Sequence, residues 1–440
     1  MLLMPEDAED QGVVRKQSRR SLGGARSSTV RSIATLLTGT VASQVIGVVT
    51  MPILSRIYGP GAFGILAIFL SVSAVVSMVA ALRYEYAIVL PSEEVEAHRL
   101  RQLSTALVIV VSTLTVLVTF IVFLTTPATE RNWWILLIGA SVLLAGETTI
   151  LYFWMTRKRR YRMQSVSRIA QAVASAAAQA VLGLLVAPSG ESLIVGYLIG
   201  QLCGVGVLLL TDDARRTAPE HDRRKWWELM VRYKKMPLLN APNALVDSLR
   251  LNGINMVIGG RSLHALGQFS MAWKLAQAPM ALIASAISQV YFQRMASAEP
   301  GTLSGLVRSV TRRALLLAFV PFLVLGLIAP VLTPWFLGPQ WTEAGLIVQA
   351  LTPWLYLNVA TAPLSTVFIV AERQGTMLVF AIVYMIVPLA VLLAAGADLV
   401  FAVWLMSAAM TILLIGMIVL AHDVARRFDA RARQPLAERR

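Results

Sequence analysis

Two hairpin segments rich in glycine, LSRIYGPGAFGILAIF at residues 54–69 and INMVIGGRSLHALGQFSMA at residues 254–272, set the plan of the chain. Each follows one apolar run and leads into another. Aligning Gly64 with Gly267 superimposes the two segments without a gap, at an offset of 203 residues. The similarity is weak, but it predicts a duplication into two halves of six helices. Two such halves facing each other across a midplane cavity are typical of transporters.

The composition indicates a membrane protein that crosses the bilayer many times. The chain has 440 residues, of which 57% are hydrophobic and 14% are charged. A soluble domain has roughly 45–50% apolar and about 25% charged residues. In such a protein a net charge of +15 reflects basic cytoplasmic loops beside anionic lipids rather than binding to nucleic acid, so we expect no nucleic-acid partner.

Twelve apolar runs are long enough to span a bilayer, which takes about 20 residues. They are residues 30–54, 62–90, 102–126, 133–155, 165–187, 193–211, 238–260, 267–291, 314–337, 344–370, 376–395 and 399–421. We therefore predict an all-α polytopic membrane protein with about twelve transmembrane helices, in two six-helix bundles around a central cavity. The predicted parts are a basic cytoplasmic tail (1–29), an N-terminal bundle (30–211), a cytoplasmic linker (212–237), a C-terminal bundle (238–421) and a second basic tail (422–440).

The orientation follows from the basic residues. The two tails and the even-numbered loops, together with Arg31 at the start of the first run, hold 32 Lys and Arg residues, whereas the odd-numbered loops hold only Arg56, Arg131 and Arg261. Cytoplasmic loops carry the excess of Lys and Arg in membrane proteins. Both termini are therefore predicted to be cytoplasmic.

Motifs for several kinds of chemistry are missing from the sequence. It contains no G-x-x-x-x-G-K-[ST] loop for ATP, no HExxH or CxxC metal pattern and no G-x-S-x-G nucleophile motif. The four histidines are scattered over loops and a tail. We therefore expect no cofactor, no metal site and no catalytic residue, and the predicted outer loops are too short to carry an enzyme domain.

A polar stripe interrupts the seventh predicted span, in NAPNALVDSLRLNG at residues 240–253. On a helix Asn240, Asn243, Asp247 and Arg250 project within a sector of about 80°. A polar stripe on a spanning helix faces protein or water rather than lipid. Two interpretations stay open: a local ion pair that locks helix packing, or a cavity lining in which Arg250 meets an anionic substrate and Asp247 a coupling cation.

Other ionisable or amide side chains fall inside predicted spans, where each is a functional hypothesis. Lys274 either snorkels to the nearby outer interface or lines the cavity as a cation. Arg83 forms an interfacial charge pair with Glu85, or it serves as an inner gate or contacts a phosphate at the cavity mouth. Glu147 makes a packing hydrogen bond or holds a proton, and the repeat sets Gln44 opposite the stripe as a polar cavity residue.

Four stretches resemble the lipid-linked oligosaccharide flippases. They are MPILSRIYGPGAFGILAIFLS, LRYEYAIVLP, RYKKMPLLNAPNALVDSLRLNGINMVI and LGQFSMAWKLAQAPMALIASAISQVYFQRMA. On these residues the chain is similar to the polysaccharide-biosynthesis family of the multidrug/oligosaccharidyl-lipid/polysaccharide exporter superfamily. The similarity covers roughly residues 40–100 and 230–300.

The resemblance implies a flippase of the bacterial plasma (inner) membrane. Its substrate would be an undecaprenyl-pyrophosphate-linked glycan, moved from the inner to the outer leaflet by alternating access with H⁺ or Na⁺ as the coupling ion. By position, Arg83, Arg250 and Lys274 would contact the anion, and Asp247 or Glu147 would couple the ion. Membrane lipids, a polysaccharide polymerase and a chain-length regulator are the implied partners.

Two other functions are weighed against the flippase. A cation-coupled multidrug exporter of the same fold would need an acidic or aromatic cavity, whereas the ionisable residues inside the spans lean toward positive charge. A membrane enzyme of glycan assembly, such as a polymerase or ligase, is disfavoured by the short outer loops.

Overall fold

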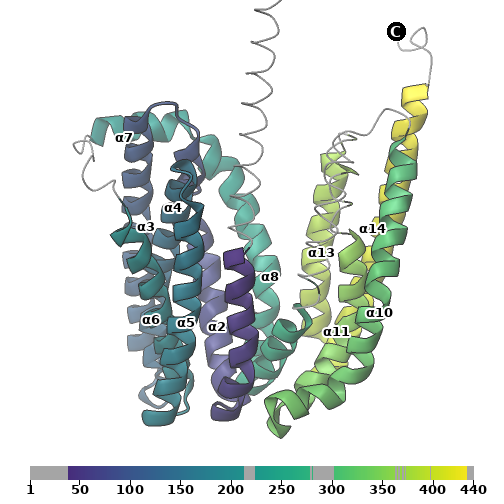
Figure 1. The fold of residues 1–440 in the computed structure, drawn as a ribbon, viewed down its shortest axis with the longest axis horizontal. Helices are drawn as coiled ribbons and strands as arrows, with labels where there is room; N and C mark the ends of the chain where they lie inside the picture. Colours follow the sequence, from purple (N-terminus) through teal and green to yellow (C-terminus); the bar gives the residue numbers. More distant parts are fainter. Residues whose placement is uncertain are drawn as a thin grey trace, which may run out of the picture. The chain divides into compact units, whose positions relative to one another are not determined.

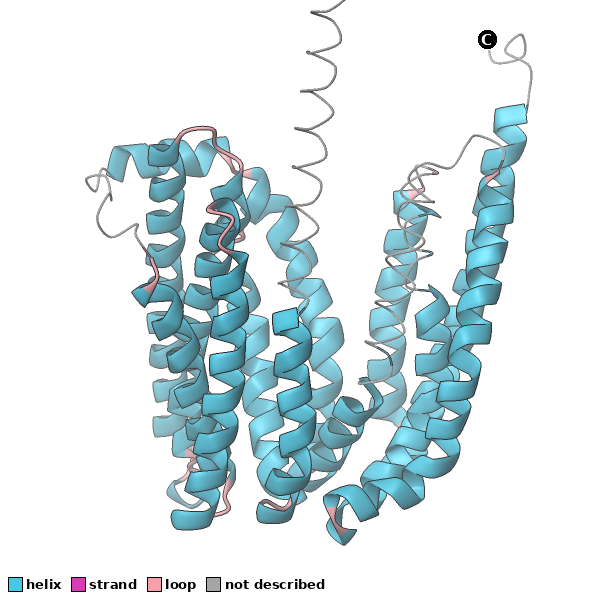
Figure 2. Ribbon diagram, in the orientation of Figure 1, coloured by secondary structure: helices cyan, strands magenta, loops and turns pink. Residues whose placement is uncertain are grey.

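The computed structural model describes residues 38–212, 223–277, 280, 302–361, 364, 367–368, 371, 373–396 and 398–433. Within these ranges every regular element is a helix (Figures 1 and 2). A helix satisfies its own backbone hydrogen bonds, which is what a chain in hydrocarbon needs. The predicted tail at 1–29 lies outside the described residues.

The described helices are joined by short connections wherever those connections lie within the described residues. In chain order they are Thr38–Ile57, α2 (Pro60–Val79), η1 (Tyr84–Val89), α3 (Glu94–Thr125), η2 (Ala128–Glu130), η3 (Trp133–Leu137), α4 (Ile138–Arg157), α5 (Tyr161–Leu185), α6 (Gly190–Leu210), α7 (Arg223–Arg232), η5 (Met236–Asn240), α8 (Ala241–Arg261), a helix over residues 263–277, α10 (Leu303–Leu337), η6 (Pro339–Trp341), α11 (Thr342–Thr361), α13 (Gln374–Ala394) and α14 (Leu399–Arg433).

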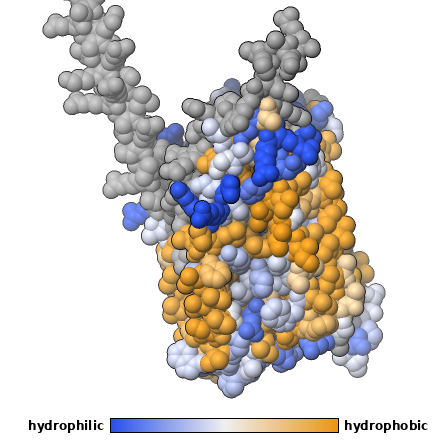
Figure 3. Space-filling model, turned by 90° about the vertical axis from the view of Figure 1, so that its right-hand side faces the viewer, coloured by the Kyte–Doolittle hydropathy of each residue, from blue (hydrophilic) through white to orange (hydrophobic). Residues whose placement is uncertain are grey.

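Nine of the described helices are long and apolar enough to cross a membrane. They include α2 to α6, α10 and α14. The three other predicted spans fall at α8, at the helix over 263–277 and at α11, and residues 281–291 of the predicted eighth span lie outside the described part. The prediction of an all-α polytopic membrane protein is confirmed. Figure 3 shows apolar side chains in a broad band on one face, with hydrophilic side chains gathered beyond it.

The chain divides into two compact units. Unit 1 contains residues up to Thr50, Ser77–Gln179 and Val195–Pro242, and unit 2 contains Met51–Val76, Ala180–Ile194 and Asn243 onward. The predicted boundaries at 30–211, 212–237 and 238–421 divide the chain by sequence alone and stay a prediction.

A close helix crossing in unit 2 has the symmetry that the duplication predicts. A Cβ atom on Gly64 would lie 1.7 Å from the carbonyl oxygen of Leu263, and one on Gly267 would lie 1.8 Å from that of Pro60. Leu263 and Gly267 follow Pro60 and Gly64 by the same 203 residues that aligned the two hairpins. The start of α2 and the start of the helix over 263–277 therefore meet backbone to backbone, through equivalent residues. Glycine is required at both places because no side chain fits.

Two helices end at residues other than the predicted ends of their spans: α2 ends earlier and α14 ends later. The predicted second span runs to residue 90, but α2 ends at Val79, and Leu82 and Arg83 then take left-handed backbone conformations (φ 48° and 66°). At the other end of the chain α14 continues to Arg433, past the predicted limit at 421. Its buried Asp429 accepts hydrogen bonds from the backbone N–H groups of Leu303 (3.1 Å) and Ser304 (2.8 Å), which caps α10.

Candidate functional site

A cavity of about 250 Å³ in unit 2 has Arg250 of α8 in its lining. Aromatic and amide side chains from α8 itself, the helix over 263–277, α11 and α13 surround this cavity, which we call the Arg250 pocket. Its aromatic lining comprises Phe269, Trp273, Trp354 and Tyr384, and its amides are Asn255, Gln277 and Asn358. An apolar pocket with a few convergent polar groups is the usual form of a small-molecule site.

The aromatic wall of the Arg250 pocket is held in place by contacts within unit 2. Trp273 packs on Trp354 with ring centroids 5.4 Å apart. The hydroxyl oxygen of Tyr384 accepts hydrogen bonds from Trp354 Nε1 (2.7 Å) and Asn358 Nδ2 (3.1 Å). Trp354 and Tyr384 are buried, so their rings stand in fixed orientations beside the cavity.

A second hollow of about 130 Å³ adjoins the first and carries Lys274, and we call it the Lys274 pocket. Asn255 and Trp273 line both pockets. Asn255 Nδ2 donates to Ser71 Oγ at 2.9 Å, which ties α8 to α2. The Lys274 ammonium lies 5.7 Å from the ring centre of Phe63, within cation–π range. The structure therefore brings two of the predicted anion-binding residues, Arg250 and Lys274, to neighbouring hollows.

Arg250 is only loosely paired. Its Nε lies 3.6 Å from Asp247 Oδ1, and its guanidinium lies 5.7 Å from the ring centre of Tyr384. The Asp247 side chain is 69% exposed, whereas that of Arg250 is 30% exposed. An exposed i,i+3 pair contributes little to stability. Most of the guanidinium donors are thus left for a ligand.

The remaining predicted site residues do not line either pocket. In unit 1, Arg83 donates to the Tyr86 hydroxyl (3.1 Å) and pairs with Glu85 (3.6 Å). Glu147 on α4 has one buried carboxyl oxygen with no hydrogen bond among the described residues.

The polar side chains beside the predicted cavity are exposed within their own units. Gln44 and Asn240 are exposed in unit 1, where Asn240 Nδ2 approaches the Met236 sulfur at 3.1 Å. Asn243 is exposed in unit 2. Their place in a central cavity stays a prediction.

Sequence reasoning missed the aromatic half of the Arg250 pocket. Trp354, Asn358 and Tyr384 come from α11 and α13, where no motif marks them. The available signal was Asn358 inside the predicted span 344–370, because an amide within a membrane span needs a hydrogen-bond partner.

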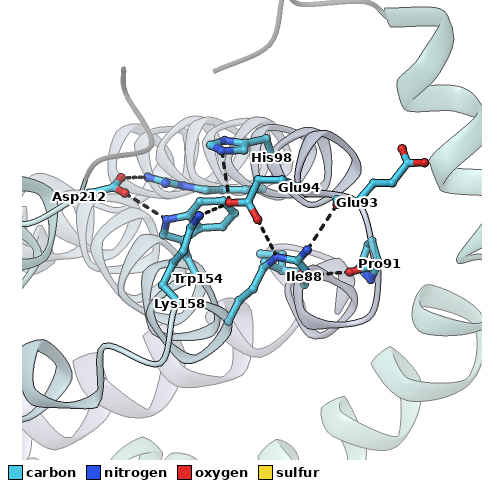
Figure 4. A network of polar contacts seen from close by, with 10 residues as sticks. Ile88, Pro91, Glu93, Glu94, His98, Trp154, Lys158 and Asp212 are labelled. Atoms are coloured by element: carbon cyan, nitrogen blue, oxygen red, sulfur yellow. Dashed lines mark hydrogen bonds and ion pairs between the residues drawn. The ribbon is translucent and has the colours of Figure 1, made fainter. Parts of the chain in front are cut away.

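A polar network in unit 1 joins the ends of α3, α4 and α6 (Figure 4). Asp212 accepts from Arg101 Nη2 (2.5 Å) and from Trp154 Nε1 (3.1 Å). Glu94 pairs with Lys158 and with Arg157.

Arg157 is the most fully satisfied cation of this network. It donates to the carbonyl oxygens of Ile88 (3.2 Å), Pro91 (2.7 Å) and Glu93 (3.3 Å). Charged groups satisfied in this way hold helices together and leave few donors for a ligand.

No group of three or more His, Cys, Asp or Glu side chains that could hold a metal ion lies within the residues that the structure describes. The pockets therefore offer cationic, amide and aromatic groups, and the described lining of both lacks a carboxylate. Such a set has the chemistry to bind an anion together with a hydroxyl-bearing molecule.

Two solved membrane proteins have folds similar to that of this chain. A structure of the lipid II flippase MurJ in an inward closed conformation matches with a TM-score of 0.71 at 10% identity, covering 90% of each chain. An inward-facing multidrug resistance MATE family transporter of the MOP superfamily matches with a TM-score of 0.68 at 12% identity, covering 88% of this chain and 96% of that one. At such identities the similarity shows the fold alone.

The family is shown by the sequence. The family model described as "Polysaccharide biosynthesis protein" matches residues 53–345, more than half of the chain. The chain therefore belongs to this polysaccharide biosynthesis family, as the resemblance predicted. None of the curated proteins compared with it matches the chain.

Proposed function

We propose that this protein is a flippase that moves a polyprenyl-pyrophosphate-linked oligosaccharide from the inner to the outer leaflet, during synthesis of a cell-surface polysaccharide. The observation that supports this best is the pair of adjoining pockets, one with Arg250 and one with Lys274, lined by amides and aromatic rings and lacking a described carboxylate. The family match and the similarity to a lipid II flippase structure also support this proposal.

The two cations have different parts in this proposal. Arg250 offers a planar set of donors that matches phosphate or carboxylate oxygens in a bidentate way, whereas Lys274 acts as a point charge. Amides such as Asn255 and Asn358 suit sugar hydroxyls, and the rings of Trp273 and Tyr384 give flat apolar surfaces. In this arrangement the pyrophosphate binds between the two cations and the first sugar lies against the aromatic wall.

The driving step is proposed to use an ion gradient. Asp247 is exposed beside Arg250, and Glu147 has a buried carboxyl oxygen without a described hydrogen bond. Either carboxylate would bind H⁺ or Na⁺ in one state of the transport cycle and release it in the other. Arg83, which is satisfied by Glu85 and Tyr86, is proposed as a phosphate contact only at the entrance from the cytoplasm.

The experiment is complementation of a strain that lacks the gene. Arg250→Ala is expected to abolish surface polysaccharide while membrane levels of the protein stay normal, because the loose Asp247 pair contributes little to stability. Arg250→Lys should restore only part of the export, since lysine lacks the bidentate fork. Arg131→Ala, at an exposed arginine that binds helix-end carbonyls, is the matched control. Normal polysaccharide with Arg250→Ala would refute the assignment of Arg250.

The same strain separates the alternatives. A flippase defect leaves single lipid-linked units on the inner leaflet, whereas a polymerase or ligase defect still exports them. A multidrug exporter would instead change the susceptibility of the strain to cationic drugs. We expect trapped units and unchanged drug susceptibility.

A further inference from the structure

The three arginines in loops predicted to lie outside differ in how the protein uses them. Arg131 donates to the carbonyl oxygens of Thr126 (3.0 Å) and Leu124 (3.1 Å), at the end of α3. Arg261 donates to three carbonyl oxygens near the end of α13, the shortest contact being 2.8 Å. Arg56 is exposed, and it makes no hydrogen bond or ion pair with any residue that the structure describes. Two of the three arginines cap helices, and the third has no such structural task.

Arg56 lines an apolar hollow of about 570 Å³ in unit 2, which we call the Arg56 groove. Ligand pockets commonly measure about 300–1,000 Å³. All its other lining residues are apolar: Pro52, Ile53, Ile57, Leu184, Trp335 and Phe336. Leu184 and Trp335 are 70% and 74% exposed. The groove thus combines one cation with a wide apolar wall open to the surroundings.

Hydrogen bonds in unit 2 hold the groove open in a defined shape. Ser55 Oγ donates to the carbonyl oxygen of Leu337 at 2.8 Å, which joins the end of the first helix to the end of α10. The carbonyl oxygen of Ser55 accepts from Gln340 Nε2 (2.7 Å) and Trp341 Nε1 (3.0 Å). Ser55 and Trp341 are buried, so these bonds are shielded from water. Arg56 and Trp335 are therefore presented by two helix ends that are fastened together.

We propose that the Arg56 groove binds the lipid anchor of the substrate at the outer leaflet, with the isoprenoid chain along the apolar wall and the phosphate at Arg56. The charge and the apolar surface match the two ends of such a lipid, and Trp335 has the amphipathic ring that sits at headgroup level. The groove differs from the Arg250 and Lys274 pockets, with which it shares no lining residue. The choice of an isoprenoid anchor over another lipid rests on the proposed function.

The test is photolabelling of the full-length protein in vesicles of phosphatidylethanolamine and phosphatidylglycerol. The probe is a polyprenyl phosphate with a diazirine in its chain, and adducts are mapped by mass spectrometry. We expect adducts on residues of the groove. Arg56→Ala should lower this labelling roughly fivefold, since one basic side chain near a membrane surface contributes about 1 kcal/mol. Ile53→Trp, which fills the hollow from an exposed position, should abolish it, and Arg131→Ala should leave it unchanged.

Two further probes decide the chemistry. A photoreactive polyprenol without phosphate should label the groove more weakly than the phosphate probe. Equal labelling, or an unchanged signal with Arg56→Ala, would overturn the phosphate site. Stronger labelling by photoreactive phosphatidylglycerol would show an ordinary bilayer lipid there and overturn the carrier assignment. Arg250→Ala should keep the groove labelling, so a failure of the proposed transport site is distinguishable from a failure of the groove.

Discussion

Arg157 of unit 1 and the two pocket cations of unit 2, Arg250 and Lys274, differ in how many partners the protein gives them. In unit 1, Arg157 donates to three backbone carbonyl oxygens and also pairs with Glu94. In unit 2, Arg250 has the exposed Asp247 at 3.6 Å, and Lys274 has no hydrogen bond or ion pair among the described residues. The Lys274 side chain is exposed and that of Arg250 is 30% exposed, so both cations keep donors available to a ligand. Cations kept loosely paired are therefore candidates for ligand binding, whereas saturated cations are candidates for structural roles.

The largest expected effect comes from breaking the polar network of unit 1 that joins α3, α4 and α6. Asp212→Ala removes the acceptor of Arg101 and of the Trp154 N–H, and the Asp212 side chain is fully buried. Removing one partner of a buried pair costs about 3–5 kcal/mol. We expect lower membrane levels and a lower Tm of the purified protein, measured by thermal unfolding in detergent. An unchanged Tm would mean that this network contributes little to the fold.

A change at Lys274 tests what happens when a cation with few protein partners is removed. Lys274→Met keeps the length of the side chain and removes a charge without a described carboxylate partner, so we expect an unchanged or higher Tm. Surface polysaccharide should fall about tenfold, as expected when a charge-assisted contact of at least 1.4 kcal/mol is lost. Lys274→Arg should restore most of the export. Full export with Lys274→Met would exclude Lys274 from the substrate site.

The smallest effect is expected at Asp247. A change there separates the part of Asp247 from that of its partner Arg250. Asp247→Asn should leave Tm unchanged, because an exposed i,i+3 pair contributes about 0.5 kcal/mol or less. Export should change by no more than about twofold if Asp247 only steadies Arg250. A loss of export as complete as that of Arg250→Ala would instead identify Asp247 as the coupling-ion site.

The spanning helices and the repeat were open to prediction because they depend on local patterns. Apolar runs of sufficient length must be helical in a bilayer, and the offset between Gly64 and Gly267 was visible by alignment. The helix limits were less predictable. The end of α14 depends on Asp429, which caps α10 by accepting a hydrogen bond from Ser304. The two residues are 125 positions apart in the sequence.

The candidate site shows the same division. The chain by itself determined that α8 carries Arg250 and Asp247 on one polar face, since helix periodicity places them there. Only the tertiary structure decided that Arg250 faces Tyr384 and Trp354 while Asp247 is exposed, and that Arg56 lines an apolar groove without a described partner. The physical reason is that hydropathy and periodicity act over a few turns of helix. Which side chains share a cavity depends on packing between helices far apart in the sequence.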